Sequence, residues 1–115
     1  MDSIDIKQDQ NLEKSIVGCL LQLGALIKDK SVAKLRTSDF KYSDERIVFQ
    51  CIKELELAEE PIDTTTVINR LKKFDKLDEV GGAYYITGLL NDIVTTAHLP
   101  SYAETLIGNT LHNNK

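Results

Sequence analysis

The sequence from residue 99 to residue 111 reads Leu-Pro-Ser-Tyr-Ala-Glu-Thr-Leu-Ile-Gly-Asn-Thr-Leu, and this stretch decides the fold class. Its apolar side chains recur at the three- and four-residue steps that place them on one face of an α-helix. They are Leu99, Tyr102, Ala103, Leu106, Ile107 and Leu111. Pro100 stands in the first turn, where a missing N–H group does no harm. We therefore predict an amphipathic α-helix over residues 99–111.

The same helical period recurs upstream, in segments that turn signals separate. We expect helices over residues 11–23 and 25–35, one that starts at Ser43, one that Asp63 caps, and one that follows Gly81-Gly82. A single turn is expected at residues 76–80, and the sequence shows no sustained period-two alternation of the kind that marks strands. The prediction is an all-α bundle of about six helices. Its last two helices are expected to form an antiparallel hairpin across residues 94–97.

The domain organisation follows from where this pattern begins and ends. Residues 1–10 are polar without a sustained period, and we interpret them as a flexible tail. Residues 11–111 form the helical domain, and residues 112–115 begin a linker or end the chain. Gly18 lies inside the first helix, where glycine costs about 1 kcal/mol relative to alanine. Either another helix approaches closely at this point, or the glycine is simply tolerated.

Composition places limits on the class of protein. The chain has 115 residues, 42% of them hydrophobic and 28% charged, which suits one globular domain. Its net charge of −4 makes it a poor candidate for binding DNA by itself, because such binding rests on Lys and Arg at phosphates. The acidic N-terminus does not resemble a signal peptide, and no apolar run is long enough to span a membrane, so a cytoplasmic protein is expected. Cys19 and Cys51 stand among apolar residues and are expected to be small buried hydrophobes.

Motifs that carry chemistry are missing from the sequence. It contains no Gly-x-x-x-x-Gly-Lys-[Ser/Thr] loop for phosphates, and His98 and His112 have no partners at metal-ligand spacing. We therefore expect neither a catalytic site nor a cofactor or metal in these residues. A basic cluster, Arg70, Lys72, Lys73 and Lys76, admits a helix-turn-helix interpretation. Neighbouring acids at 75, 78 and 79 favour a solvated helix face instead.

Adjacent apolar residues point to a surface for protein contacts. Tyr84 and Tyr85 follow one another, so a helix cannot bury both on one face. One of them is therefore expected at the surface or against a partner. The wide apolar stripe of the last helix faces either the core of the domain or a second subunit.

Six short motifs occur in a fixed order over residues 10–111. They are Glu13-x-Ser15-Ile16-Val17-Gly18-x-Leu20-Leu21, Ser38-Asp39-Phe40, Arg46-Ile47-Val48-Phe49-x-x-Ile52, Pro61-Ile62-Asp63-x-x-Thr66-Val67, Leu77-x-Glu79-Val80-Gly81-Gly82-x-x-Tyr85-Ile86-x-x-Leu89 and Tyr102-Ala103-x-x-Leu106. In this order and spacing they resemble the N-terminal domain of DnaB-type replicative DNA helicases. Four positions depart from the family pattern: Lys41 replaces a tyrosine, Glu45 a histidine, Val94 a proline and His98 an asparagine. These departures indicate a divergent lineage, such as that of a phage or mobile element.

The resemblance implies a function in assembly and docking. Family members are homohexameric rings that unwind DNA with ATP and Mg²⁺, which bind in a separate ATPase domain. Their N-terminal domains pair into a collar, a trimer of dimers, that docks primase and influences ring loading, in some cases with a loader. By position, Glu13 and Tyr85 correspond to residues implicated in primase contact. Tyr102, Leu106 and Ile107 lie on the hairpin that would pair subunits.

Two other functions remain open from the sequence. A stand-alone regulator could imitate the helicase collar, and a stop codon directly after Lys115 would favour it over a helicase with a downstream phosphate loop. A small helix-turn-helix protein would bind DNA in a salt-dependent manner through the basic cluster.

Overall fold

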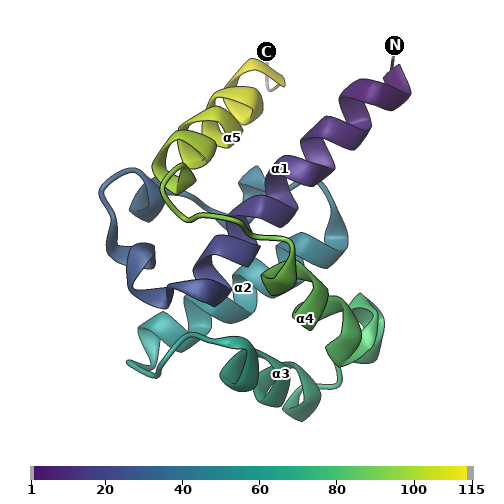
Figure 1. Ribbon diagram of the computed structural model, residues 1–115, viewed down its shortest axis with the longest axis vertical. Helices are drawn as coiled ribbons and strands as arrows, with labels where there is room; N and C mark the ends of the chain where they lie inside the picture. Colours follow the sequence, from purple (N-terminus) through teal and green to yellow (C-terminus); the bar gives the residue numbers. More distant parts are fainter. Residues whose placement is uncertain (1, 114–115) are drawn as a thin grey trace.

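Five α-helices and four short 3-10 helices make up the computed structural model, which describes the backbone of residues 2–113 and the side chains of residues 9–111 (Figure 1). The α-helices are α1 (Asp2–Gln22), α2 (Ser43–Leu57), α3 (Thr64–Lys73), α4 (Gly82–Asn91) and α5 (Leu99–Asn113). The 3-10 helices are η1 (Gly24–Lys28), η2 (Val32–Lys34), η3 (Thr37–Asp39) and η4 (Asp78–Val80). The described residues contain no strand, so the prediction of an all-α fold is confirmed.

Helix α1 is the centre of the core, with α2, α4 and α5 packed around it (Figure 1). Every residue from Ile16 to Leu21 is buried, which requires neighbours on all sides of the helix. Both cysteines are buried and free, as predicted. Phe49, which lies off the main apolar stripe of α2, is fully buried and stacks on Phe40 with ring centroids 4.6 Å apart.

Gly18 marks the point where α4 comes closest to α1. A Cβ atom built on Gly18 would lie 2.6 Å from the carbonyl oxygen of Leu89 and 2.8 Å from Cγ1 of Ile93. Distances this short do not occur for real Cβ atoms, so any larger residue would push the two helices apart. Of the two explanations for this glycine, close approach of another helix is therefore the one that holds.

The last two helices do not form the predicted hairpin. Helices α4 and α5 each pack on α1, and they diverge from the connection at residues 92–98 (Figure 1). The cause is the burial of α1, against which each of the two helices packs separately. The antiparallel partner of α5 is α1 itself, which runs beside it in the reverse direction.

Two further expectations differ from the structure. The segment 25–35 forms the separate 3-10 helices η1 and η2 instead of an α-helix, because the Asp29 side chain accepts the backbone N–H groups of Ser31 and Val32 in a turn between them. The segment 1–10 was predicted as a tail, whereas α1 begins at Asp2. Residues 2–10 contain neither glycine nor proline, and their early acids favour a helix N-terminus. Residues 112–115 lie beyond the side chains that the structure describes.

Turn signals between α2 and α4 act as the sequence predicts. The Asp63 side chain accepts the N–H of Thr66 at 2.9 Å, and Thr66 Oγ1 accepts the N–H of Asp63 at 3.0 Å, which completes a capping box at the start of α3. The one turn expected at 76–80 is η4. Gly81 follows it at φ 107°, a left-handed conformation that glycine adopts without strain.

Candidate functional site

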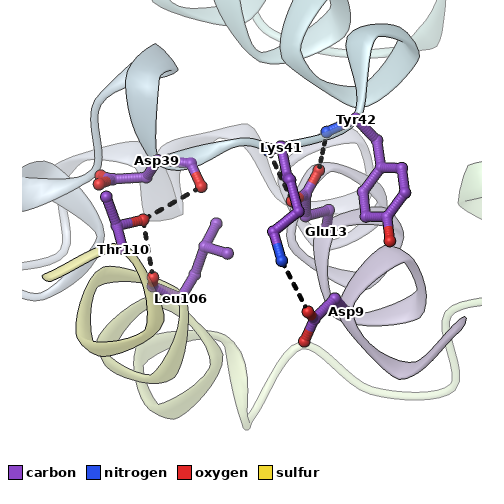
Figure 2. Close-up of polar contacts among 7 residues, drawn as sticks. All are labelled: Asp9, Glu13, Asp39, Lys41, Tyr42, Leu106 and Thr110. Atoms are coloured by element: carbon purple, nitrogen blue, oxygen red, sulfur yellow. Dashed lines mark hydrogen bonds and ion pairs between the residues drawn. The ribbon is translucent and has the colours of Figure 1, made fainter. Parts of the chain in front are cut away.

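Among the described side chains of α1, Glu13 is the buried charged one, and it is 0% exposed. Its carboxylate accepts two backbone hydrogen bonds, from the N–H of Lys41 at 2.8 Å and from the N–H of Tyr42 at 3.1 Å (Figure 2). These two N–H groups belong to the extended segment just before α2, where no helical partner is within reach. Glu13 therefore fixes the entry of the chain into α2.

A second buried carboxylate, Glu45, lies in the first turn of α2 and is also 0% exposed. The hydroxyl of Tyr85, from α4, donates a hydrogen bond to Oε2 of Glu45, while Oε1 has no hydrogen-bond partner among the described residues. We call the group Asp9, Glu13, Lys41, Tyr42, Glu45 and Tyr85 the α1–α2–α4 junction. It joins three helices through polar contacts inside an otherwise apolar core.

Burial sets the protonation behaviour of this junction. Desolvation raises the pKa of Glu13 to about 7, against the two backbone hydrogen bonds that lower it, and the nearby charge of Glu45 raises it further. Desolvation likewise raises the pKa of the Tyr85 hydroxyl, helped by its hydrogen bond to Glu45. The raised pKa keeps the Tyr85 hydroxyl protonated, and therefore a donor to Glu45, at neutral pH.

Lys41 and Asp9 form a partly exposed ion pair at the outer edge of the junction. Lys41 Nζ lies 2.9 Å from Oδ2 of Asp9, and the hydrogen bond to Asp9 raises the pKa of Lys41 (Figure 2). Both side chains are partly exposed, so this ion pair contributes less than about 1 kcal/mol to stability. It places the Lys41 ammonium group beside Asp9, four residues before the buried Glu13 on α1.

The predicted partner residues Glu13 and Tyr85 thus meet in one place, although neither is a typical surface contact. Glu13 is buried, and Tyr85 is half-buried with its hydroxyl directed to Glu45. Its neighbour Tyr84 is 92% exposed, which confirms that α4 can bury only one of the two tyrosines. Sequence reasoning missed Glu45 as a buried group, since an acid in the first turn of a helix is ordinarily solvated. The replacement of the family's histidine at this position was the available signal.

The predicted subunit-interface residues of α5 divide between core and surface. Leu106 is 3% exposed and packs within the domain, whereas Tyr102 and Ile107 are half-buried and Leu111 is 60% exposed. The hydroxyl of Thr110 donates to two backbone carbonyl oxygens, that of Asp39 at 3.3 Å and that of Leu106 at 3.2 Å (Figure 2). Near the middle of α5, Ser31 Oγ donates to Glu104 at 2.7 Å. Helix α5 is therefore fixed against η2 and η3, with an apolar edge left at the surface.

The basic cluster of α3 is partly neutralised within the chain. Arg70 Nε donates to Oε1 of Glu54 at 3.0 Å, and Lys76 lies 3.8 Å from Glu79. Among the residues that the structure describes, no group of three or more His, Cys, Asp or Glu side chains is arranged to hold a metal ion. Over the same residues, no helix is both long enough and apolar enough to cross a bilayer.

Comparison with known proteins places this arrangement in context. Residues 5–107 match the family model described as the DnaB-like helicase N terminal domain. The replicative DNA helicase DnaC of Bacillus subtilis is 32% identical over 98 residues, which cover 84% of this chain and 21% of that protein. The replicative DNA helicase DnaB of Mycobacterium leprae is 32% identical over 96 residues, 84% of this chain and 16% of that protein. The chain therefore spans about a fifth of the length of these relatives.

A solved structure shares the fold. The crystal structure of the N-terminal domain of DnaB helicase from Mycobacterium tuberculosis superposes with a TM-score of 0.81 at 30% sequence identity. The match covers 87% of this chain and 69% of that one.

Proposed function

This chain belongs to the family of DnaB-like helicase N-terminal domains, and from that premise we propose that it is the collar domain of a hexameric replicative helicase. In this role it gathers subunits into a ring and docks primase, and it performs no chemistry of its own. ATP and Mg²⁺ would bind in an ATPase domain outside the matched segment, and DNA would be gripped there. The observation that carries the proposal is the match of nearly the whole chain to a solved helicase N-terminal domain.

Subunit pairing is proposed for the surface edge of α5. Ile107 and Leu111, one turn apart, present apolar area on one side of the stripe formed by Leu99, Ala103 and Leu106, which attaches the helix to the core. The half-buried Tyr102 flanks the same stripe on its other side. Because α5 is also held by Ser31 and Asp39, its exposed edge is rigid before any partner arrives. A rigid apolar surface loses little conformational entropy on association, which favours binding.

Primase docking is proposed for the surface over the α1–α2–α4 junction. Glu13 and Tyr85 support this role indirectly, since Glu13 holds the backbone of Lys41 and Tyr42 and Tyr85 holds Glu45. We propose that these buried residues position the start of α2, and that side chains on its surface, including Lys41, contact the partner. Two of the four departures from the family pattern, Lys41 and Glu45, lie in this junction. The partner surface has therefore diverged together with its support.

Sedimentation equilibrium of the chain over a wide concentration range tests the subunit-pairing surface. The wild-type chain is expected to form dimers, whereas the double variant Ile107→Ser with Leu111→Ser should dimerise at least tenfold more weakly, because each lost apolar contact removes about 1 kcal/mol or more. Val94→Ser is the matched control, since Val94 is 97% exposed and lies outside α5. A wild-type chain that stays monomeric at millimolar concentration, or a double variant that dimerises like the wild type, would contradict the proposal.

A further inference from the structure

Helices α2 and α3 form a helical pair with a groove at one of its ends. The groove measures about 640 Å³ and lies along residues of both helices and of the segments flanking them. Its apolar lining includes Ile47, Leu71 and Phe74, of which Phe74 is 52% exposed. Arg70 Cζ lies 5.2 Å and Lys73 Nζ 5.7 Å from the centroid of the Phe74 ring, and the exposed part of the ring provides an apolar surface for a partner side chain.

The polar lining of this groove is basic, although the chain as a whole has a net charge of −4. Arg46, Arg70 and Lys76 line it, and the one acid among its lining residues, Glu54, is already engaged. Glu54 accepts from Arg70 Nε at 3.0 Å and from Gln50 Nε2 at 2.9 Å. Lys76 lies 3.8 Å from Glu79, and Arg46 Nη1 donates to the carbonyl oxygen of Phe40 at 3.3 Å. Two acids against three cations leave one surplus positive charge, and each guanidinium has five donors of which one is used in these bonds. The groove is therefore suited to an acidic segment that also carries an apolar side chain.

Such a segment exists at the opposite end of the same helical pair. Leu57, the last residue of α2, is 81% exposed, and the exposed acids Glu59 and Glu60 follow it in the connection to α3. We call residues 57–60 the acidic tip. Figure 1 shows this connection at the far end of α2 from the segment that leads into the helix.

The backbone of the acidic tip is fixed and strained. The N–H of Glu59 donates to Glu56 O and the N–H of Glu60 donates to Leu55 O, both at 3.0 Å, which closes a Schellman motif at the end of α2. Glu59 occupies the left-handed position of this motif at φ 58°, where glycine is the usual residue. A glutamate there costs about 1 kcal/mol, and Asp75 adopts the same φ of 58° after α3, so the motif fixes the direction in which residues 57–60 leave the helix.

We propose that the acidic tip of one copy of this chain docks into the basic groove of a second copy, and reciprocally, in a two-fold contact between antiparallel α2–α3 pairs. Leu57 would pack near Phe74 of the other copy, and Glu60 would lie near its Lys76. The groove and the acidic tip both include residues of α2, and Arg46 in the groove is separated from Leu57 in the tip by about 16 Å of helix rise. Two antiparallel copies share this spacing, so both contacts form together.

This contact deepens the proposed function and rests on it, because it assumes that copies of the chain meet. It is distinct from the edge of α5, which lies on a different helix. A closed ring built from dimers requires a second kind of contact between the dimers, and the α2–α3 pair supplies one.

Charge-reversal variants test the contact. They are made in the Ile107→Ser and Leu111→Ser double variant, which lacks the α5 surface and is the parent protein for this experiment. Lys76→Glu and Glu60→Lys each place like charges opposite one another twice in the two-fold contact. Each is expected to weaken self-association about tenfold at low ionic strength in sedimentation equilibrium. An equimolar mixture of the two variants should regain the affinity of the parent, because every opposed pair then has opposite charges. Both positions are exposed, so folding should be unaffected.

Leu57→Ser should also weaken association about tenfold in this background, and Val94→Ser is again the control. Self-association that is unchanged in Lys76→Glu and Glu60→Lys would overturn the inference and leave the groove to an acidic segment of another protein. A parent that is monomeric at millimolar concentration would overturn it as well. In either case, dimers of the chain with an intact α5 would still uphold the proposed function, so the two failures can be told apart.

Discussion

Helix α1 makes two contacts, little more than one turn apart, that hold the domain together by different physical means. At Gly18 it meets α4 without space for a single carbon atom, and the contact is apolar apart from the Leu89 carbonyl oxygen. At Glu13 it meets the start of α2 through a buried carboxylate and two backbone N–H groups. The first contact depends on shape alone, whereas the second depends on protonation.

The difference indicates which of the two contacts responds to pH and to neighbouring substitutions, and which does not. A steric contact of backbone against backbone tolerates no larger residue and is indifferent to pH. A buried acid that is hydrogen-bonded on one side and repelled by Glu45 on the other responds in a graded way to pH and to neighbouring substitutions. The surface that we assign to partner binding lies over the adjustable contact.

Gly18→Val should give the largest effect, a loss of about 3 kcal/mol in the free energy of unfolding, because its Cβ would overlap Leu89 O and force α4 away from α1. Urea denaturation followed by circular dichroism measures it. Gly88→Ala is the matched control, since Gly88 is also helical and has open space around it, and it should stabilise the domain by about 0.5–1 kcal/mol. If Gly18→Val and Gly88→Ala changed the free energy of unfolding in the same way, the close approach of α4 to α1 at Gly18 would be contradicted.

Tyr85→Phe should rank second, with a loss of about 2 kcal/mol, because it removes the donor to Oε2 of Glu45 and leaves that buried carboxylate unpaired. Denaturation measures the stability, and calorimetric titration with primase measures the proposed docking. We expect primase binding to weaken as well, although Tyr85 is directed into the domain. Tyr84→Phe is the control with an exposed hydroxyl. A fully stable Tyr85→Phe domain would show that the junction does not depend on this bond.

Glu13→Gln should give an effect whose size depends on pH and which is smallest below pH 4.5, where the Glu13 carboxyl is neutral like the amide that replaces it. The folded pKa is raised from 4.5 to about 7, so the folded state binds more protons than the unfolded state between these values. The stabilisation is therefore complete below pH 4.5 and is lost as the pH rises through 7. Relative to Glu13→Gln, the wild type should lose at most about 1.4 kcal/mol of stability for each pH unit over this range. Parallel stability curves for the two proteins between these pH values would contradict the raised pKa.

Periodicity and turn chemistry predicted most of the fold from the sequence. The stripe at 99–111, the Asp63 cap and the Gly81-Gly82 break all correspond to observed features, because each depends on neighbours within a few residues. The hairpin between the last two helices was wrong, since a short connection between helices does not determine what each of them packs against. Here both helices pack against α1, which lies nearly eighty residues earlier in the chain.

The candidate site was less accessible to sequence reasoning. The family resemblance pointed to Glu13 and Tyr85 but gave no sign that they meet through Glu45 inside the core. A charged residue on a helix is exposed in most proteins, and only tertiary structure shows the exception. The acidic tip is a further example: Glu59 adopts a left-handed conformation that a local pattern would assign to glycine.

The two cysteines, described above as part of the core, also determine how this protein can be studied. Cys19 is 0% exposed and Cys51 3%, and burial raises the pKa of both thiols, that of Cys51 to about 12. Neither thiol forms a thiolate near neutral pH, so alkylating reagents should react with them only when the domain opens. A cysteine introduced at Val94 would then be the sole reactive thiol on the folded chain. A fluorophore or spin label attached there would report distances between copies without background from the native sulfur atoms.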